Sequence, residues 1–258
     1  MPDDQRPLES APQASNSVIV QPGGRVFPTI NAALASITDN RLQKQYLLSV
    51  GPGTYNEKVT MKPFVSIQGA GQELTTITQP AASDAFSGGT VMAASNCTLA
   101  NVTVSSLGGV WGSYSTALSC SGAINFSVDS STLIVDDQNQ AGVNQCTLDA
   151  ALNTFEPLSQ IRVFYCLIKC TAQNNQSGAA AAGIAAQSTA DIFYSKLVAK
   201  GGRQPFGVIT ARSSRVTIDN GYVEGSYFAL YDSDGGAIIT ANKCQINGPV
   251  SNGVVVNN

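Results

Sequence analysis

The stretch QIRVFYCLIKC at residues 160–170 decides the fold, because its arrangement recurs along the second half of the chain. In it an apolar strand fragment meets a small residue and then a second apolar fragment. Related segments are AINFSVDSSTLIV at 123–135, ADIFYSKLVAK at 190–200, SRVTIDNGYVEG at 214–225 and AIITANKCQING at 237–248. A strand unit repeated in this way predicts a solenoid of stacked coils built from short strands.

Apolar residues five positions apart bring six segments into register. The expected core pairs are Cys97/Val102, Val128/Leu133, Val163/Ile168, Ile192/Leu197, Ile218/Val223 and Ala241/Ile246. A small residue follows the first member of each pair by three positions, at Ala100, Ser131, Cys166, Ser195, Gly221 and Cys244. Stacked coils need such a column of small residues where the chain bends sharply and neighbouring coils pack closely. The irregular distances between repeats predict constant strands joined by variable loops.

Composition excludes several classes of protein. Charged residues make up only 12% of the 258 residues, which argues against long amphipathic helices. The net charge is −3 and no two basic residues are adjacent, so we expect no nucleic-acid partner. No stretch approaches the roughly 20 apolar residues of a membrane span.

Histidine is absent, so any catalysis must rest on carboxylates, tyrosine, lysine, arginine or amides. The six cysteines match no zinc pattern, and YDSDGG at 231–236 lacks the late glutamate of an EF-hand loop, so we interpret it as a turn. The sequence therefore predicts neither a metal site nor a cofactor. Two of the cysteines fall in the small column, and we expect buried, reduced thiols.

The N-terminal segment differs from the coils. Residues 1–17 are polar and rich in proline and serine, without the apolar region of a signal peptide, so we expect a disordered leader before a single domain at 18–258. With reduced thiols, this predicts a cytoplasmic protein unless a signal was removed or export is non-classical. Phe27, Ile30 and Leu34 lie at helical spacing and predict a short helix that caps the open end of the solenoid.

Several motifs, in order along the chain, resemble those of the pectinesterases. They are RVFPTINAAL at 25–34, YLLSVGPGTYNEKV at 46–59, VSIQGAGQELTTIT at 65–78, CTLANVTV at 97–104 and SKLVAKGGRQPFGVITAR at 195–212. The similarity runs from about residue 20 to residue 248. It implies an all-β fold, a single-stranded right-handed parallel β-helix of the pectin lyase-like type, in agreement with the register of the repeats.

Pectinesterases, as a family, hydrolyse methyl esters of polygalacturonate with two aspartates, oxyanion-binding glutamines and an arginine. Counting the family's motifs along this sequence transfers those positions. The oxyanion glutamine falls on Tyr114, the acid/base aspartate on Gln138 beside Asp137, the nucleophile on Gln173 and the arginine on Tyr231. Residues of such a set act as a unit, so their replacement argues against an active carbohydrate esterase, which remains the third alternative.

The first alternative is a β-helix that binds an extended, uronate-type polysaccharide or serves as a structural or adhesive module, which is compatible with an oligomer. Trp111, Arg203 and Arg212 are its candidate substrate-binding residues. Together with Lys200 and Arg215, the two arginines come from successive coils, and we expect these basic residues on one face, where arginine binds carboxylates through two hydrogen bonds.

The second alternative is a cofactor-free enzyme of altered chemistry, an isomerase, cyclase or lyase acting on a small molecule or a glycan. Asp137 would be its general base, and Tyr114, Gln138, Gln173 and Tyr231 would donate hydrogen bonds to developing charge. The sequence alone does not decide whether the protein is an enzyme.

Overall fold

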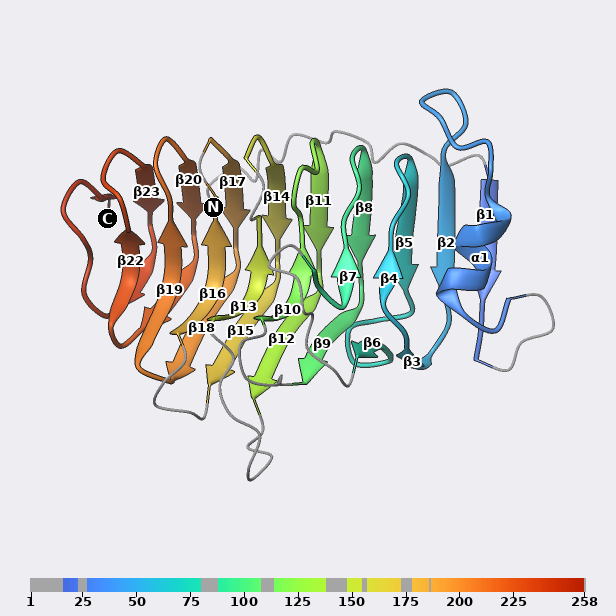
Figure 1. The fold of residues 1–258 in the computed structure, drawn as a ribbon, viewed down its shortest axis with the longest axis horizontal. Helices are drawn as coiled ribbons and strands as arrows, with labels where there is room; N and C mark the ends of the chain where they lie inside the picture. The colour runs from blue at the N-terminus through green and yellow to red at the C-terminus, as the bar shows by residue number, and fades with distance from the viewer. Residues whose placement is uncertain are drawn as a thin grey trace, which may run out of the picture.

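The computed structural model describes residues 16–22, 27–79, 88–107, 114–137, 148–154, 157–172, 178–185 and 187–257. They form an elongated stack of coils whose strands run side by side along its length (Figure 1). All strand pairs inside the three sheets are parallel, and one short helix, α1 (Ile30–Ser36), is present in the described chain. This is the predicted parallel β-helix.

Three sheets form the walls of the helix, with ten, eight and seven strands, and we call them the first, second and third sheet. The first sheet contains β1 (Asn16–Val20), β2 (Tyr46–Val50), β5 (Val65–Gly69), β8 (Cys97–Ala100), β11 (Phe126–Asp129), β14 (Gln160–Phe164), β17 (Thr189–Phe193), β20 (Arg215–Asp219), β23 (Ile238–Asn242) and β25 (Val255–Asn257). The second contains β3 (Gly53–Asn56), β6 (Thr75–Gln79), β9 (Thr103–Leu107), β12 (Thr132–Asp137), β15 (Leu167–Ala172), β18 (Lys196–Gly201), β21 (Tyr222–Gly225) and β24 (Gln245–Asn247). The third contains β4 (Val59–Thr60), β7 (Val91–Met92), β10 (Tyr114–Ser119), β13 (Leu148–Asn153), β16 (Gly178–Ile184), β19 (Gln204–Thr210) and β22 (Phe228–Asp232).

From β2 to β24, successive strands belong to the first, second and third sheet in turn. The chain therefore turns at three corners per coil. We call the corner between the first and second sheets the first corner, and the corner between the second and third sheets the second corner. Buried apolar side chains from all three sheets form one main cluster inside the coils. Burying this continuous core is what holds the coils together, since a single coil has no core of its own.

The predicted register is confirmed for five of the six core pairs. The aligned positions are Val128, Val163, Ile192, Ile218 and Ala241 in the first sheet, and Leu133, Ile168, Leu197, Val223 and Ile246 in the second. The first pair is wrong by two residues: Leu99, and not Cys97, aligns with Val128. Val102 therefore takes the place in the column that was expected for Ala100, and its N–H donates to the Ser131 hydroxyl at 3.3 Å.

The first corner is a tight turn in which one residue adopts a left-handed conformation. Its φ angle is positive in six coils, at Asn101, Ser130, Tyr165, Tyr194, Asn220 and Lys243. The next residue along the chain is the one in the small column. Ser195 shows its role: its hydroxyl accepts from the Cys166 N–H at 3.0 Å and donates to the Phe193 carbonyl at 2.8 Å. The column thus links coils by hydrogen bonds besides saving space.

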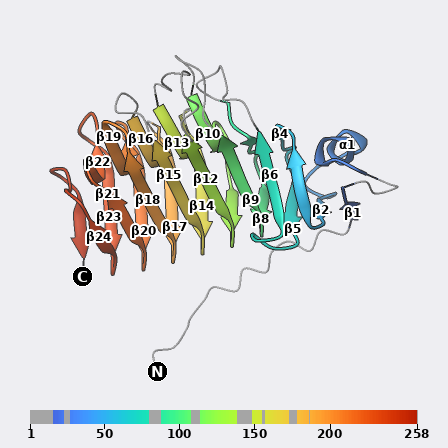
Figure 2. The same cartoon turned by 90° about the horizontal axis from the view of Figure 1, so that it is seen from below.

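The short helix α1 lies at the N-terminal end of the stack, beside β1 and β2 (Figure 2). Thr29 caps it by accepting from the Ala32 N–H at 3.1 Å, and the Glu57 carboxylate accepts from the first two helical N–H groups at 2.8 and 2.9 Å. Ile30 and Leu34 are buried against the core. The predicted helix is confirmed, and Glu57, part of the pectinesterase-like motif, serves it as a second N-terminal cap.

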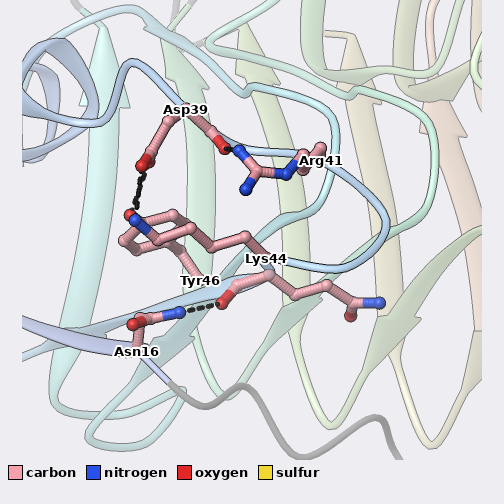
Figure 3. A network of polar contacts seen from close by, with 6 residues as sticks. Asn16, Asp39, Arg41, Lys44 and Tyr46 are labelled. Atoms are coloured by element: carbon pink, nitrogen blue, oxygen red, sulfur yellow. Dashed lines mark hydrogen bonds and ion pairs between the residues drawn. The ribbon is translucent and has the colours of Figure 1, made fainter.

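A polar network fixes the segment between α1 and β2 (Figure 3). The Asp39 carboxylate accepts from the Tyr46 hydroxyl at 2.6 Å and from the Lys44 ammonium, and the hydrogen bond from Lys44 is the main reason that its pKa is lowered. Asn16 donates to the Gln45 carbonyl at 3.2 Å and joins β1 to the same segment. The predicted leader, 1–17, lies outside the described residues except for its last two, which begin β1.

The described cysteines are free thiols. Cys97, Cys120, Cys166 and Cys170 are buried and Cys244 is partly buried, while Cys146 lies outside the described residues. Burial raises the pKa of the Cys97 and Cys166 thiols to about 12, so these groups are protonated at neutral pH.

Candidate functional site

Two of the candidate catalytic residues that the sequence predicted, Tyr114 and Asp137, lie at the second corner. Tyr114 begins β10 in one coil, and Asp137 ends β12 in the next. Trp111, Gln138 and Gln173 lie outside the described residues. Chain order therefore brings Tyr114 and Asp137 to one corner in successive coils. The cofactor-free enzyme that we built on these residues stays a prediction.

Tyr231 does not belong to that group. It lies in β22, four strands along the third sheet from β10 through β13, β16 and β19. Tyr114 is in register with Gln204, whereas Tyr231 is in register with Ile209, five residues further along the strand. At about 4.8 Å per strand and 3.3 Å per residue, the two Cα atoms are roughly 20 to 25 Å apart. Gap-free counting back from Cys244 failed because the coils differ in length.

The contacts of Tyr231 are those of a packed aromatic residue. Its ring stacks on Phe206 with centroids 5.1 Å apart and lies against Phe228 at 4.7 Å. Phe206 belongs to a small cluster with Ala150 and Ala180 that is separate from the main core. These residues come from the third sheet and their cluster is not part of the interior, so Tyr231 packs on the outer side of that sheet.

The structure also separates the basic residues that were expected on one face. Lys200 and Arg203 lie at the second corner, and Lys200 pairs with Glu224 at 3.3 Å. Arg212 lies in the turn after β19, between the third and first sheets, and Arg215 begins β20 in the first sheet. Arg203 and Arg212 are both exposed but are found at different corners. They cannot form a single carboxylate-binding face.

An open groove of about 540 Å³ follows the first corner across successive coils. Cys166, Ser195 and Gly221, three members of the small column, line its bottom, where Cys166 and Ser195 are each only 3% exposed. Tyr165 and Tyr194 line the side next to the first sheet. The small column thus opens a channel on the outside of the corner while it links the coils.

The other side of the groove is formed by the first residues of three second-sheet strands, Leu167, Lys196 and Tyr222, which are in register. Gln72, Asn220 and Gln245 complete the lining with amide groups. The groove therefore presents amides, tyrosine rings and one ammonium along a straight path.

The two tyrosines adopt a backbone conformation that suits neither of them. Tyr165 has φ of 53° and Tyr194 has φ of 49°. A bulky residue in the left-handed region of φ costs roughly 1 to 2 kcal/mol. Asparagine tolerates this conformation, and it occupies the same turn position in other coils, at Asn101 and Asn220. The rings stack with centroids 5.2 Å apart, which returns about 0.5 to 1.5 kcal/mol. They nevertheless remain 49% and 52% exposed.

A polar network supports the other side of the groove. The Lys196 ammonium lies over the Tyr222 ring, 4.9 Å from its centroid. The Tyr222 hydroxyl donates to the Glu224 carboxylate at 2.8 Å and accepts from the Asn247 amide at 3.3 Å. The Tyr222 hydrogen bond, followed by that from Lys200, lowers the pKa of Glu224. The Tyr222 side chain is thus held in place by a cation over its ring and by two hydrogen bonds at its hydroxyl.

The sequence carried a signal for this groove that our reading missed. The strings VFYCLI at 163–168 and IFYSKL at 192–197 place the same Phe-Tyr pair directly before the small column in successive repeats. Parallel stacking makes such pairs neighbours: Phe164 and Phe193 stack at 5.1 Å, as the tyrosines do. A repeated exposed aromatic beside a small column therefore predicts an aromatic ladder.

Neither the comparison with protein-family models nor the comparison with curated proteins finds a match. Solved structures do match over most of the chain. The pectin methylesterase from carrot is 14% identical with a TM-score of 0.54, over 92% of this chain and 85% of that one. The enzyme from Erwinia chrysanthemi is 13% identical with a TM-score of 0.53 (93% and 80%), and that from Aspergillus niger is 16% identical with a TM-score of 0.54 (92% and 86%).

The protein is therefore a parallel β-helix with the fold of the pectin methylesterases. At these identities the similarity establishes the fold alone, and the function has to be argued from the residues of this chain. Within the described ranges, no helix is long and apolar enough to cross a membrane.

Proposed function

We propose that this β-helix binds an extended polysaccharide along the groove at the first corner. The observation that carries the proposal is the pair of exposed tyrosines, Tyr165 and Tyr194, held beside the groove at left-handed positions. Strained residues that the fold does not require tend to mark functional sites. Asparagine adopts this left-handed conformation with less strain than tyrosine. The turn therefore does not explain the tyrosine rings, whereas ligand binding does.

The chemistry of the groove suits sugars. The phenol hydroxyls of Tyr165 and Tyr194 form no hydrogen bond with a described residue, and Asn220 and Gln245 add amide donors and acceptors close by. Aromatic rings combined with a few amides are typical of sites that take polar, partly apolar ligands. The groove is open and runs from coil to coil along the axis of the β-helix, as an extended sugar chain requires.

The fold itself is compatible with such a ligand. A pectin methylesterase solved in complex with a hexasaccharide matches this chain with a TM-score of 0.51 at 12% identity. That protein shows that a β-helix of this shape accommodates an oligosaccharide. The groove proposed here rests on this chain's own residues.

The proposal is tested by replacing both tyrosines with asparagine, which keeps the turn and removes the rings. We expect binding of hexasaccharides, measured by calorimetry, to weaken by about 10- to 30-fold, the equivalent of about 1.4 to 2 kcal/mol. The melting temperature should stay within a few degrees of the wild type, because the relief of strain offsets the lost stack.

The matched control is Tyr227→Asn, since Tyr227 is 43% exposed and lies at the second corner, away from the groove. Its binding should equal that of the wild type. Unchanged binding in the double variant, or no binding of any acidic or neutral hexasaccharide at millimolar concentration, would overturn the proposal.

A further inference from the structure

We infer that the groove selects acidic sugars and that the Lys196 ammonium binds a sugar carboxylate. The inference rests on the proposed function, because it specifies the ligand of the same groove. It comes from an ammonium on the second-sheet side of the groove that forms no ion pair among the described residues.

Lys196 stands apart from the lysines that form ion pairs. Lys44 pairs with Asp39 and Lys200 pairs with Glu224. Among the described residues, no carboxylate forms an ion pair with Lys196, although its side chain is exposed at the groove. Its ammonium lies over the Tyr222 ring, which attracts the cation but offers its N–H groups no lone pair in the ring plane. It also acts on the Glu224 carboxylate through space, without an ion pair.

The nearest acid on this side of the groove is already committed. Glu224 accepts from the Tyr222 hydroxyl and pairs with Lys200, and both contacts lower its pKa. Glu224 therefore balances the charge of Lys200 and fixes the Tyr222 ring. The charge of Lys196 also lowers the pKa of Glu224, but only through space, so the ammonium keeps no carboxylate in direct contact and stays exposed at the groove.

The geometry limits where the ammonium can be. A lysine side chain is flexible, but the Tyr222 ring holds the ammonium at the groove. The Lys196 backbone is in register with Leu167 of the preceding coil and Tyr222 of the next. Tyr194, which lines the opposite side of the groove, lies two residues before Lys196 in the chain. A sugar ring seated between Tyr194 and Tyr222 has this one cation beside it. A carboxylate is the sugar substituent that matches such a point charge.

The experiment compares oligogalacturonate with a neutral oligogalactoside of the same length, using wild type, Lys196→Gln and Lys58→Gln. Lys58 is exposed in the coil next to α1 and has no part in the groove, so its variant makes the same charge change elsewhere. We expect the wild type and Lys58→Gln to bind the acidic ligand roughly tenfold more tightly than the neutral one. In Lys196→Gln the ratio should fall to about one, with the neutral ligand unaffected, and high salt should have the same effect.

The outcomes separate this inference from the proposed function. If the acidic and neutral ligands bind the wild type equally, or if Lys196→Gln keeps the preference, the groove binds glycans but Lys196 does not bind their carboxylates. Either result overturns the inference. If neither ligand binds, the proposed function itself fails. Circular dichroism on Lys196→Gln confirms that a lost preference is not a loss of fold.

Discussion

Removing the Ser195 hydroxyl tests whether the small column links the coils by hydrogen bonds. Ser195 is 3% exposed, accepts from the Cys166 N–H at 3.0 Å and donates to the Phe193 carbonyl at 2.8 Å. In Ser195→Ala the carbonyl keeps another partner, since the Tyr165 N–H also donates to it at 3.1 Å. The Cys166 N–H keeps none in the observed geometry, so the cost is that of one buried, unpaired amide, about 1 to 3 kcal/mol.

The column supplies its own matched control. Cys244 holds the equivalent place two coils on, where its thiol accepts from the Gly221 N–H at 3.4 Å and donates to the Asn242 carbonyl at 3.2 Å. Ser195→Cys should therefore keep both contacts, with longer bonds, and cost less than about 1 kcal/mol.

The assay is denaturant unfolding together with amide hydrogen exchange at Cys166. For a domain of this size, about 2 kcal/mol corresponds to a drop of about 4 to 8 °C in melting temperature. Exchange at Cys166 should be faster in Ser195→Ala than in Ser195→Cys. If both variants lose the same stability, or if Ser195→Ala loses less than about 0.5 kcal/mol, the hydroxyl is only a space-filling group and the reasoning is wrong.

Three further predictions follow from local geometry. Gly201→Ala should destabilise the fold by more than about 2 kcal/mol, because φ is +71° and an added Cβ would lie 1.9 Å from a carbonyl oxygen of the preceding coil. Gly122→Ala is its control, since φ is +69° there and an added Cβ would have no atom within 4 Å. Equal losses of stability in the two variants would show that the cost comes from the φ angle and not from the steric clash. Iodoacetamide at pH 8 should leave Cys97 and Cys166 unmodified in the native protein and alkylate both in urea, because burial raises their thiol pKa to about 12; peptide mass spectrometry reads this, and rapid native labelling contradicts it. Glu57→Gln should cost about 1 to 2 kcal/mol through the α1 cap, measured by unfolding, and no change would mean that Thr29 suffices alone.

The repeats were predictable because their signal is local. Each coil carries the same apolar alternation around a small residue, and neighbouring coils repeat it in register. The error at the first pair also has a local cause. Strand side chains alternate with a period of two, so Cys97 and Leu99 both point into the core and are both buried. A shift of two residues leaves the apolar pattern unchanged, and only the hydrogen-bonded ladder distinguishes the two registers.

The candidate site was predictable only in part. Chain order alone places Tyr114 and Asp137 at one corner, since Tyr114 begins a strand of the third sheet and Asp137 ends a strand of the second sheet. Tyr231 could not be placed by counting, because loops of different length between strands change the position of every later residue. Arg203 and Arg212 were grouped by spacing, but the whole length of β19, a strand of the third sheet, lies between them.

The sequence by itself determined the β-helix, its capping helix and the column of small residues, because each depends on which residues alternate between apolar and polar over a few positions. The groove at the first corner was decided by the tertiary structure. Stacking of coils puts Tyr165 and Tyr194 in ring contact and sets Lys196 over Tyr222, from separate repeats. The repeated Phe-Tyr pair is a local signal for the ladder, but only the left-handed turn holds the tyrosine rings in solvent beside the column. The scaffold follows from periodicity, and its binding surface follows from contacts between coils.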